Sequence, residues 1–437
     1  MTHTAVKDVL PVLQRSILVD GFKVVFDHKK SRGARFVDAQ TGKSYIDFFS
    51  FFASNPIGFN HPKMADPQFE KELLEVAKVK ISNSDIYTTQ FADFVSSFHK
   101  QFAPMFDKLF FIDGGALGVE NAIKTAQDWK VQKNMAAGKG EKGVQVMHFR
   151  EAFHGRTGYT MSLTNTDPNK TKYFAKFDWP RITNPKVHFP LTNESMEKTK
   201  ALEVQAEDEI KNAFHSRPDE ICCILLETIQ GEGGDNFFRK EFLQRLKSLA
   251  LENDALLIFD EVQTGFGFTG KRWAFENFDV QPDLIAFGKK VQVCGCAVKM
   301  ERLNEVENVF KVSSRINSTW GGNLTDMVRC TKFIEIIAEE NLIEHAKNMG
   351  EFMLGEIQKI SEANQIMSNP RGLGLWMAFD MPSKELRDRA IAALYINGLM
   401  ILPCGQRSIR IRPVLDIHKN EAEEGLEILR KTLSTLA

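Results

Sequence analysis

The stretch Leu251–Gly295, LENDALLIFDEVQTGFGFTGKRWAFENFDVQPDLIAFGKKVQVCG, decides the fold of this chain. It contains two short apolar runs, Ala255–Phe259 and Leu284–Phe287, whose length and flanking turn residues predict buried strands. Asp260 follows the first run, and Lys289 follows the second after a single glycine. In an open α/β sheet, ligands bind outside the carboxyl ends of the strands. The stretch therefore predicts a carboxylate and an amine at the ligand-binding edge of one sheet.

Alternation of strand and helix continues upstream of this stretch. Three apolar runs read as strands: LFFID at 109–113, VQVMHF at 144–149 and ICCILLET at 221–228. Helical patterns separate them, one of which covers Leu117–Lys133. Strands that alternate with helices predict an α/β fold with a mostly parallel sheet. Between them, the Thr- and Asn-rich segment Thr157–Asn193 is too long for a passive connection, so we expect a functional or interface loop.

The two ends of the chain carry a different pattern. Ala34–Phe49 reads as a β-hairpin that turns at Gly42, and the last third returns to helices and short strands. We expect both ends to form one smaller α+β domain. The predicted boundaries are 1–66 for its N-terminal segment, 67–325 for the large domain and 326–437 for its C-terminal segment.

Composition limits the class of protein. The chain has 437 residues, 43% hydrophobic and 26% charged, with a formal net charge of −1, which is typical of a globular protein and favours neither nucleic acid nor membrane partners. The N-terminus lacks a secretory pattern and no apolar run is long enough to span a bilayer.

Six cysteines lie mostly in apolar runs. No second pair or histidine completes a metal site around Cys294 and Cys296, so we expect buried reduced cysteines, no metal and a cytoplasmic protein.

Lys289 and Asp260 are the first candidate functional residues. An amine desolvated at the end of a buried strand becomes a usable nucleophile. Taken alone, Lys289 is more simply interpreted as a surface lysine. Lys290 is the competing candidate for the nucleophile, because both amines are available. Asp260 ends an apolar run and is a poor candidate for a solvated carboxylate, although it could cap the next turn. In pyridoxal-phosphate enzymes such a carboxylate keeps the pyridine nitrogen protonated.

A glycine turn completes the set. Gly114 and Gly115 lie between a predicted strand and a predicted helix, where backbone amides can cradle a phosphate. The turn, Asp260 and Lys289 would contact the phosphate, ring nitrogen and aldehyde of one cofactor, pyridoxal 5′-phosphate. A competing G-x-G-x-x-G match, Gly265–Gly270, starts five residues after its strand and precedes no apolar helix, so it does not predict nucleotide binding.

Longer motifs resemble the class III, or ω-, aminotransferases of fold type I over nearly the whole chain. They are LLIFDEVQTGFGFTGKRWAFE at 256–276, PDLIAFGKK at 282–290, FHGRTGYT at 153–160 and RINSTWGGN at 315–323. LLETIQGEGGD, AFGKKVQVCG and SRINSTWGGNLTDMVR are nearest the branch that uses the ε-amine of L-lysine. The resemblance implies a large domain with a mostly parallel seven-stranded sheet, a smaller α+β domain from both chain ends, pyridoxal 5′-phosphate as cofactor, and a homodimer.

The same resemblance implies a role for each matching residue. Lys289 would bond covalently to the cofactor aldehyde and shuttle the proton, and Asp260 would pair with the ring nitrogen. The remaining cofactor contacts would be the backbone of Gly115 and Ala116, the ring of Phe153, the amide of Gln263 and, from the partner subunit, Ser318 and Thr319.

For the substrates, the resemblance implies L-lysine as donor and 2-oxoglutarate as acceptor. Arg156 would bind the remote carboxylate of the donor, and Arg412 the α-carboxylate of the acceptor. Glu232, flanked by glycines, would neutralise Arg412 when the ε-amine of lysine reacts, since a buried cation needs a partner. Gln263 and Asn317 would lie near the substrate. Another ω-aminotransferase, for 4-aminobutyrate or ornithine, and a catalytically silent cofactor-binding protein are the alternatives.

Overall fold

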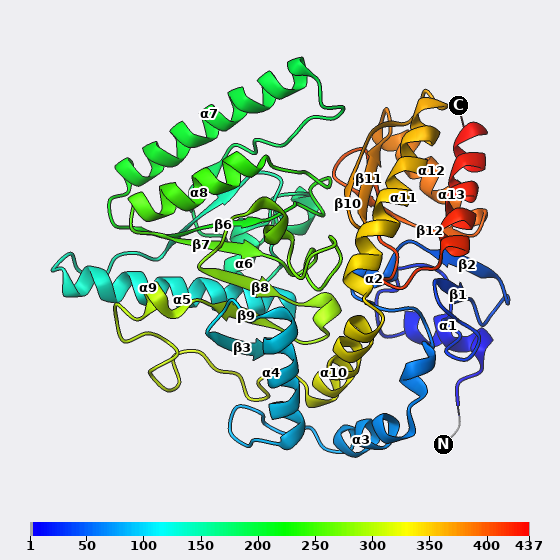
Figure 1. Ribbon diagram of the computed structural model, residues 1–437, viewed down its shortest axis with the longest axis horizontal. Helices are drawn as coiled ribbons and strands as arrows, with labels where there is room; N and C mark the ends of the chain where they lie inside the picture. The colour runs from blue at the N-terminus through cyan, green and yellow to red at the C-terminus, as the bar shows by residue number, and fades with distance from the viewer. Residues whose placement is uncertain (1–2, 437) are drawn as a thin grey trace.

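The computed structural model describes residues 3–436 and is built around a seven-stranded sheet (Figure 1). The strand order is β3-β9-β8-β7-β6-β4-β5. Neighbours from β8 to β5 pair in parallel, and β9 alone runs opposite to its neighbours β8 and β3. The strands span β3 Lys108–Ile112, β4 Gln145–Phe149, β5 Arg181–Ile182, β6 Ile221–Glu227, β7 Leu256–Asp260, β8 Leu284–Phe287 and β9 Cys294–Val298. The predicted mostly parallel seven-stranded sheet is confirmed.

Helices cover both faces of this sheet, which explains why the central strands β6, β7 and β8 are apolar at every position before their last residues. Alternate side chains of a strand point to opposite faces. Leu225 and Ile258 pack with α5 (Gly115–Ala136), whereas Leu226 and Leu257 belong to the core that includes α8 (Lys240–Glu252). The other helices beside the large sheet are α4 Thr89–Phe102, α6 Gly158–Leu163, α7 Asn193–Ser216 and α9 Met300–Leu303.

Two smaller sheets bring the chain ends together beside the large sheet (Figure 1). The predicted hairpin forms, with β1 (Arg35–Val37) antiparallel to β2 (Ser44–Asp47), and β12 (Leu399–Met400) adds to β2 in parallel. A four-stranded sheet has the order β10-β11-β14-β13, with β10 Ser368–Leu373, β11 Trp376–Asp380, β13 Leu402–Cys404 and β14 Ser408–Ile411. The hairpin therefore packs with the last third of the chain, as the sequence predicts.

The remaining helices connect or cover these sheets. They are α1 Val9–Gln14, α2 Ser50–Ala53, α3 Pro67–Ala77, α10 Leu324–Glu339, α11 Leu342–Glu362, α12 Lys384–Ile396 and α13 Lys419–Ser434. None of the helices within residues 3–436 is long and apolar enough to cross a membrane. All six cysteines are buried and free, as expected.

The glycine run at 265–270 is a tightly packed turn. A Cβ on Gly265 would lie 2.4 Å from the Trp273 ring, and one on Gly270 would lie 2.8 Å from Lys347. The run leads into a short 3-10 helix, Ala274–Phe278, instead of the long helix that a dinucleotide-binding turn requires. The glycines are thus explained by close packing.

Candidate active site

The ends of three neighbouring strands meet at one cavity of about 280 Å³. Glu227 and Asp260 are the last residues of β6 and β7 and lie in register, and Lys289 follows β8 in a short 3-10 helix, Lys289–Val291. The predicted site residues that line the cavity are Gly115, Ala116, Phe153, Arg156, Glu232, Asp260, Gln263 and Lys289. The structure therefore brings together the carboxylate, the amine and the glycine turn.

Of the two adjacent lysines, Lys289 faces the cavity. Burial lowers the pKa of its amine, Arg410 acts in the same direction, and Asp260 opposes them. A lowered pKa increases the fraction of neutral, nucleophilic amine. The Lys290 side chain turns away: its Nζ donates a hydrogen bond to the carbonyl of Gln263 (2.9 Å) and lies 4.0 Å from the centre of the Phe268 ring. Lys289 is therefore the lysine available for chemistry.

Asp260 is held by His154, a histidine for which the sequence predicted no role. The Nδ1 atom of His154 lies 2.8 Å from Asp260 Oδ2, and the amide of Val262 donates to Oδ1 (3.0 Å). His154 is buried, and its Nε2 atom has no hydrogen-bond partner in the described chain. These contacts fix the direction of the carboxylate. The sequence indicated that the Asp260 carboxylate is buried, and a buried carboxylate requires a polar partner.

Glu227 is a second carboxylate that the sequence reasoning missed. Its two oxygens accept hydrogen bonds from the amides of Phe153 and Gly231, both at 2.9 Å. Burial raises the pKa of Glu227 to about 7; His154 opposes the rise and Asp260 adds to it. Like Asp260, Glu227 ends an all-apolar strand, so the pattern that singled out Asp260 could have found it.

The glycine turn forms the opposite wall. Gly114, with φ +102°, precedes α5, whose first amides have no partner within the helix. A Cβ on Gly115 would lie 2.8 Å from Val262 Cγ1, and one on Gly155 would lie 2.4 Å from Ala116 Cβ. The backbone thus approaches the cavity closely, and the helix N-terminus directs N–H groups and a partial positive charge toward it.

Four predicted residues do not line this cavity: Arg412, which is described below, and three neighbours in the sequence. Asn317, Ser318 and Thr319 belong to the irregular segment before α10, where Asn317 and Thr319 are exposed and Ser318 is half-buried. The hydroxyls of Ser82 and Ser84 bind the carbonyls of Thr319 and Ser318, respectively. These two contacts hold the segment at the surface of the chain.

Arg412 does not have the partner that the sequence analysis gave it. Its guanidinium is buried, donates to Asp235 Oδ1 (2.5 Å) and stacks on the Trp376 ring at 3.5 Å. It also donates to the carbonyls of Met377 and Ile411, both at 3.0 Å. The predicted Glu232–Arg412 pair is therefore wrong for this structure. Asp235, three residues further on, already neutralises the guanidinium.

Arg410 is the arginine whose charge acts on Lys289. It is 6% exposed, and within residues 3–436 its side chain makes no ion pair or hydrogen bond; its nearest aromatic neighbour is the Phe52 ring, 5.7 Å away. A buried cation without an anion is costly unless a ligand supplies one. Arg410 and Arg412 both belong to the segment SIRIRP at 408–413, and among the described residues only Arg412 has a carboxylate partner.

Glu232 and Arg156 both line the cavity. Glu232 pairs with Lys170, from the long Thr157–Asn193 segment, and its buried Oε2 atom has no hydrogen-bond partner among the described residues. Arg156 is exposed at the cavity. The long segment is thus part of the site, as expected for a loop of that length.

Comparison with known proteins identifies the family. A model described as Aminotransferase class-III matches residues 19–433. The chain belongs to the class III aminotransferases. This aminotransferase is 46% identical over 434 residues to an "L-lysine-epsilon aminotransferase" of Amycolatopsis lactamdurans, covering 98% of this chain and 96% of that protein. A Streptomyces clavuligerus protein with the same description is 44% identical over 436 residues, 99% and 95% of the two chains.

A solved structure agrees with these relatives. The chain superposes with a TM-score of 0.97 on "Lysine aminotransferase from M. tuberculosis in the internal aldimine form", with 45% identity and coverage of 99% of this chain and 100% of that one. The fold of this aminotransferase is therefore that of pyridoxal-phosphate transaminases.

The cavity of this class III aminotransferase fits its cofactor, pyridoxal 5′-phosphate. The N-terminus of α5 offers free amides for a phosphate, Asp260 offers a fixed carboxylate for a protonated ring nitrogen, and Lys289 offers an amine for an aldehyde. Gln263 Oε1 is buried without a hydrogen-bond partner in the described chain, which leaves the amide free for a bound group. The donors and acceptors are thus those that the cofactor requires.

Proposed function

We propose that the protein is an L-lysine 6-aminotransferase, which transfers the ε-amino group of L-lysine to 2-oxoglutarate. The products are L-glutamate and 2-aminoadipate 6-semialdehyde. The reaction class is supported above all by one observation: Lys289, a buried lysine of lowered pKa, lines the same cavity as the fixed Asp260 carboxylate and the N-terminus of α5. The choice of donor is supported by the relatives described as L-lysine-epsilon aminotransferases.

The protein residues divide the chemistry among them. Bound pyridoxal 5′-phosphate supplies an electron sink, and the protein supplies position and proton transfer. Lys289, whose pKa is lowered by burial, would remove a proton from the reacting carbon of the substrate and deliver it to the former aldehyde carbon of the cofactor, on the other side of the transferred nitrogen. Asp260, oriented by His154, holds the proton on the ring nitrogen. Gly115 and Ala116 bind the phosphate through their amides.

One aromatic side chain and one amide side chain complete the cofactor site. Phe153 packs against the face of the ring and Gln263 binds its phenolic oxygen, since both line the cavity beside Asp260. Asn317, which precedes Ser318 in the surface segment before α10 and lies outside the cavity of its own chain, contacts the substrate in the partner subunit.

The substrate carboxylates are bound by two arginines. Arg410 replaces Arg412 as the cation for the α-carboxylate of 2-oxoglutarate, because Arg412 is committed to Asp235. Arg156, at the open side of the cavity, binds the remote carboxylate of lysine. When the ε-amine of lysine reacts, no carboxylate lies beside Arg410, and Glu232 leaves Lys170 to neutralise it.

The active form is a homodimer in the cytoplasm. Ser318 and Thr319 bind the phosphate in the partner subunit, which is consistent with their position outside the cavity of their own chain. Exposed aromatic side chains support an interface: Tyr87 is 76% exposed and Tyr173 83%. The six free cysteines support a reducing compartment.

The experiment that tests this function is a set of half-reactions. Purified protein loaded with pyridoxal 5′-phosphate is mixed with lysine, ornithine or 4-aminobutyrate, and loss of the cofactor's visible absorbance is followed. Lysine should react with the highest kcat/KM, and 2-oxoglutarate should restore the absorbance and yield glutamate. A faster reaction with ornithine or 4-aminobutyrate would favour that alternative ω-aminotransferase. A protein that stays colourless with added cofactor would overturn the assignment and favour a silent binding protein.

A further inference from the structure

Glu232 lies at the tip of a short loop whose base is closed by two hydrogen bonds. Gln230 and Asn236 exchange backbone N–H···O bonds of 3.0 Å each, and the segment between them, Gly231–Asp235, is glycine-rich. We call residues 230–236 the Glu232 loop. The loop separates two cavities: Glu232 lines the active-site cavity, whereas Gly233 and Gly234 line a larger one of about 550 Å³. A displacement of the loop therefore moves Glu232 into or out of the active site.

The four-stranded sheet and the residues that flank its strands bind this loop through four hydrogen bonds, to Glu232, Gly234 and Asp235. The amide of Gly405, in the β13–β14 turn, donates to the carbonyl of Glu232 (2.7 Å). Arg371 on β10 donates to the carbonyls of Gly234 (2.6 Å) and Asp235 (2.9 Å). Beyond β14, Arg412 donates to the Asp235 side chain (2.5 Å). The position of the loop is thus set by elements more than a hundred residues away in the sequence.

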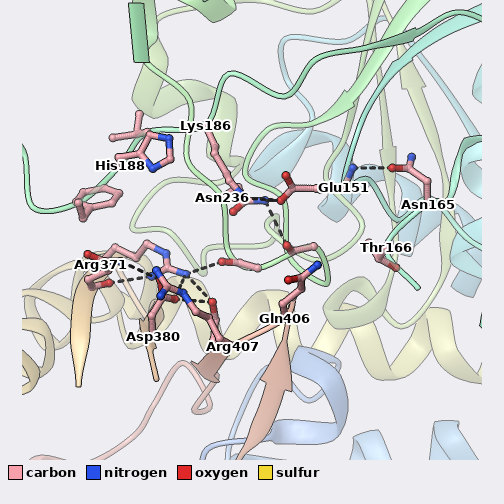
Figure 2. Close-up of a pocket in the computed structure, with 17 residues that line it drawn as sticks. Glu151, Asn165, Thr166, Lys186, His188, Asn236, Arg371, Asp380, Gln406 and Arg407 are labelled. Carbon is pink, nitrogen blue, oxygen red and sulfur yellow. Dashed lines mark hydrogen bonds and ion pairs between the residues drawn. The ribbon is translucent and has the colours of Figure 1, made fainter. Parts of the chain in front are cut away.

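Arg371 is the central contact of this set. It is 7% exposed, and Asp380 neutralises it at 3.0 Å, with the Ser408 hydroxyl also 3.0 Å away. The pairing of β10 with β11 is irregular between Ser368 and Arg371, and such bulges re-aim side chains. Figure 2 shows Arg371, Asp380 and Arg407 together on one side of the larger cavity, with Lys186, Asn236 and Glu151 across from them.

We propose that Arg371 is a positioning residue for Glu232: by holding the carbonyls of Gly234 and Asp235 from the four-stranded sheet, it fixes how far Glu232 reaches toward Arg410. It thereby sets the balance between the donor and acceptor half-reactions. This rests on the proposed function, in which Glu232 neutralises Arg410 only while lysine reacts. Arg371 itself touches neither cofactor nor substrate.

The chain supplies a matched control for this role. Arg407 lines the same cavity and pairs with the same carboxylate, Asp380, at 3.5 Å, yet its side chain is half exposed and no hydrogen bond joins it to the Glu232 loop within residues 3–436. Arg371→Met and Arg407→Met both remove a cation from Asp380. Only Arg371→Met also releases the loop carbonyls.

The test compares the two half-reactions of the loaded enzyme by single-turnover absorbance. The ratio of the apparent dissociation constants for the donor and for 2-oxoglutarate should rise about tenfold in Arg371→Met, within the range of couplings between contacting residues. In Arg407→Met the ratio should stay within about twofold of the wild type. Exchange of backbone hydrogens in the peptide spanning residues 229–238, measured by mass spectrometry, should be faster in Arg371→Met alone.

A double-mutant cycle with Glu232→Gln separates positioning from a general loss of structure. If Arg371 acts through Glu232, Arg371→Met adds no further change to the ratio in the Glu232→Gln background. An equal change in both backgrounds, or an unchanged ratio and exchange rate in Arg371→Met, would overturn the proposal. If Arg371→Met does not fold, Arg371→Lys serves instead, because an ammonium cannot reach both carbonyls and Asp380 in the geometry of a guanidinium.

Failure of the proposed function would be visible separately. It would appear in the wild-type enzyme as a lack of reaction with lysine. The ratio would then be measured with the preferred donor.

Discussion

Exchanging Arg410 or Arg412 for methionine should have opposite consequences, because among the described residues Arg412 has a carboxylate partner and Arg410 does not. Arg410→Met removes a buried guanidinium that no described residue pairs, and thereby the proposed ligand of the 2-oxoglutarate carboxylate. Loss of one partner of a buried charge pair costs about 2–5 kcal/mol. The kcat/KM for 2-oxoglutarate should therefore fall roughly 30- to 5,000-fold, since each 1.4 kcal/mol is about a factor of ten.

The two substitutions should affect the free energy of unfolding in the reverse order, with the larger loss in Arg412→Met. Arg410→Met leaves no buried ion behind, so the free energy of unfolding should stay the same or rise. Arg412→Met strands the fully buried Asp235 carboxylate and empties the space over Trp376. Breaking a buried pair in this way destabilises a protein by about 3–5 kcal/mol, although burial should drive Asp235 to take up a proton and so recover part of that loss.

The assay combines thermal unfolding of each loaded variant with half-reactions for 2-oxoglutarate and lysine. Arg410→Met should unfold at or above the wild-type temperature and lose mainly the acceptor half-reaction. Arg412→Met should unfold earlier. The reasoning is refuted if Arg410→Met keeps its wild-type kcat/KM for 2-oxoglutarate, or if a folded Arg412→Met loses that half-reaction selectively.

Three further predictions concern the cavity. Lys289→Ala should abolish turnover and the visible absorbance of the bound cofactor, whereas Lys290→Met should keep borohydride-reducible cofactor attachment; attachment lost only in the second variant would contradict the assignment. The folded-state pKa of Glu227 is about 7, against an ordinary value of 4.5. Between these two pH values the folded state binds more protons than the unfolded state. Glu227 therefore makes the free energy of unfolding fall as the pH rises from about 4.5 to 7. Denaturant unfolding of Glu227→Gln should show the variant gaining stability relative to wild type across that window, and a pH-independent difference would argue against a raised pKa. His154→Leu leaves Asp260 Oδ2 without its hydrogen bond and should weaken cofactor binding by roughly 5- to 150-fold, the equivalent of about 1–3 kcal/mol, as measured by dialysis; unchanged affinity would remove His154 from the site.

The sequence by itself determined the sheet and the ligand-binding edge. Apolar runs of four to six residues, separated by helices, leave few arrangements other than a parallel sheet covered on both faces. Because parallel strands end at the same edge, Asp260 and Lys289 had to meet there, and the glycine turn before α5 had to face them. These are consequences of local periodicity and strand direction, which a single chain records in its order of residues.

Only the tertiary structure decided which charges pair. Lys289 and Lys290 are adjacent in sequence, yet the turn after β8, with φ +49° at Lys289, sends one amine to the cavity and the other to the carbonyl of Gln263. Arg412 rather than Arg410 meets Asp235, 177 residues away. His154 meets Asp260, 106 residues away. Ion pairs and hydrogen bonds depend on distances of about 3 Å between such remote groups, and no local pattern encodes those distances.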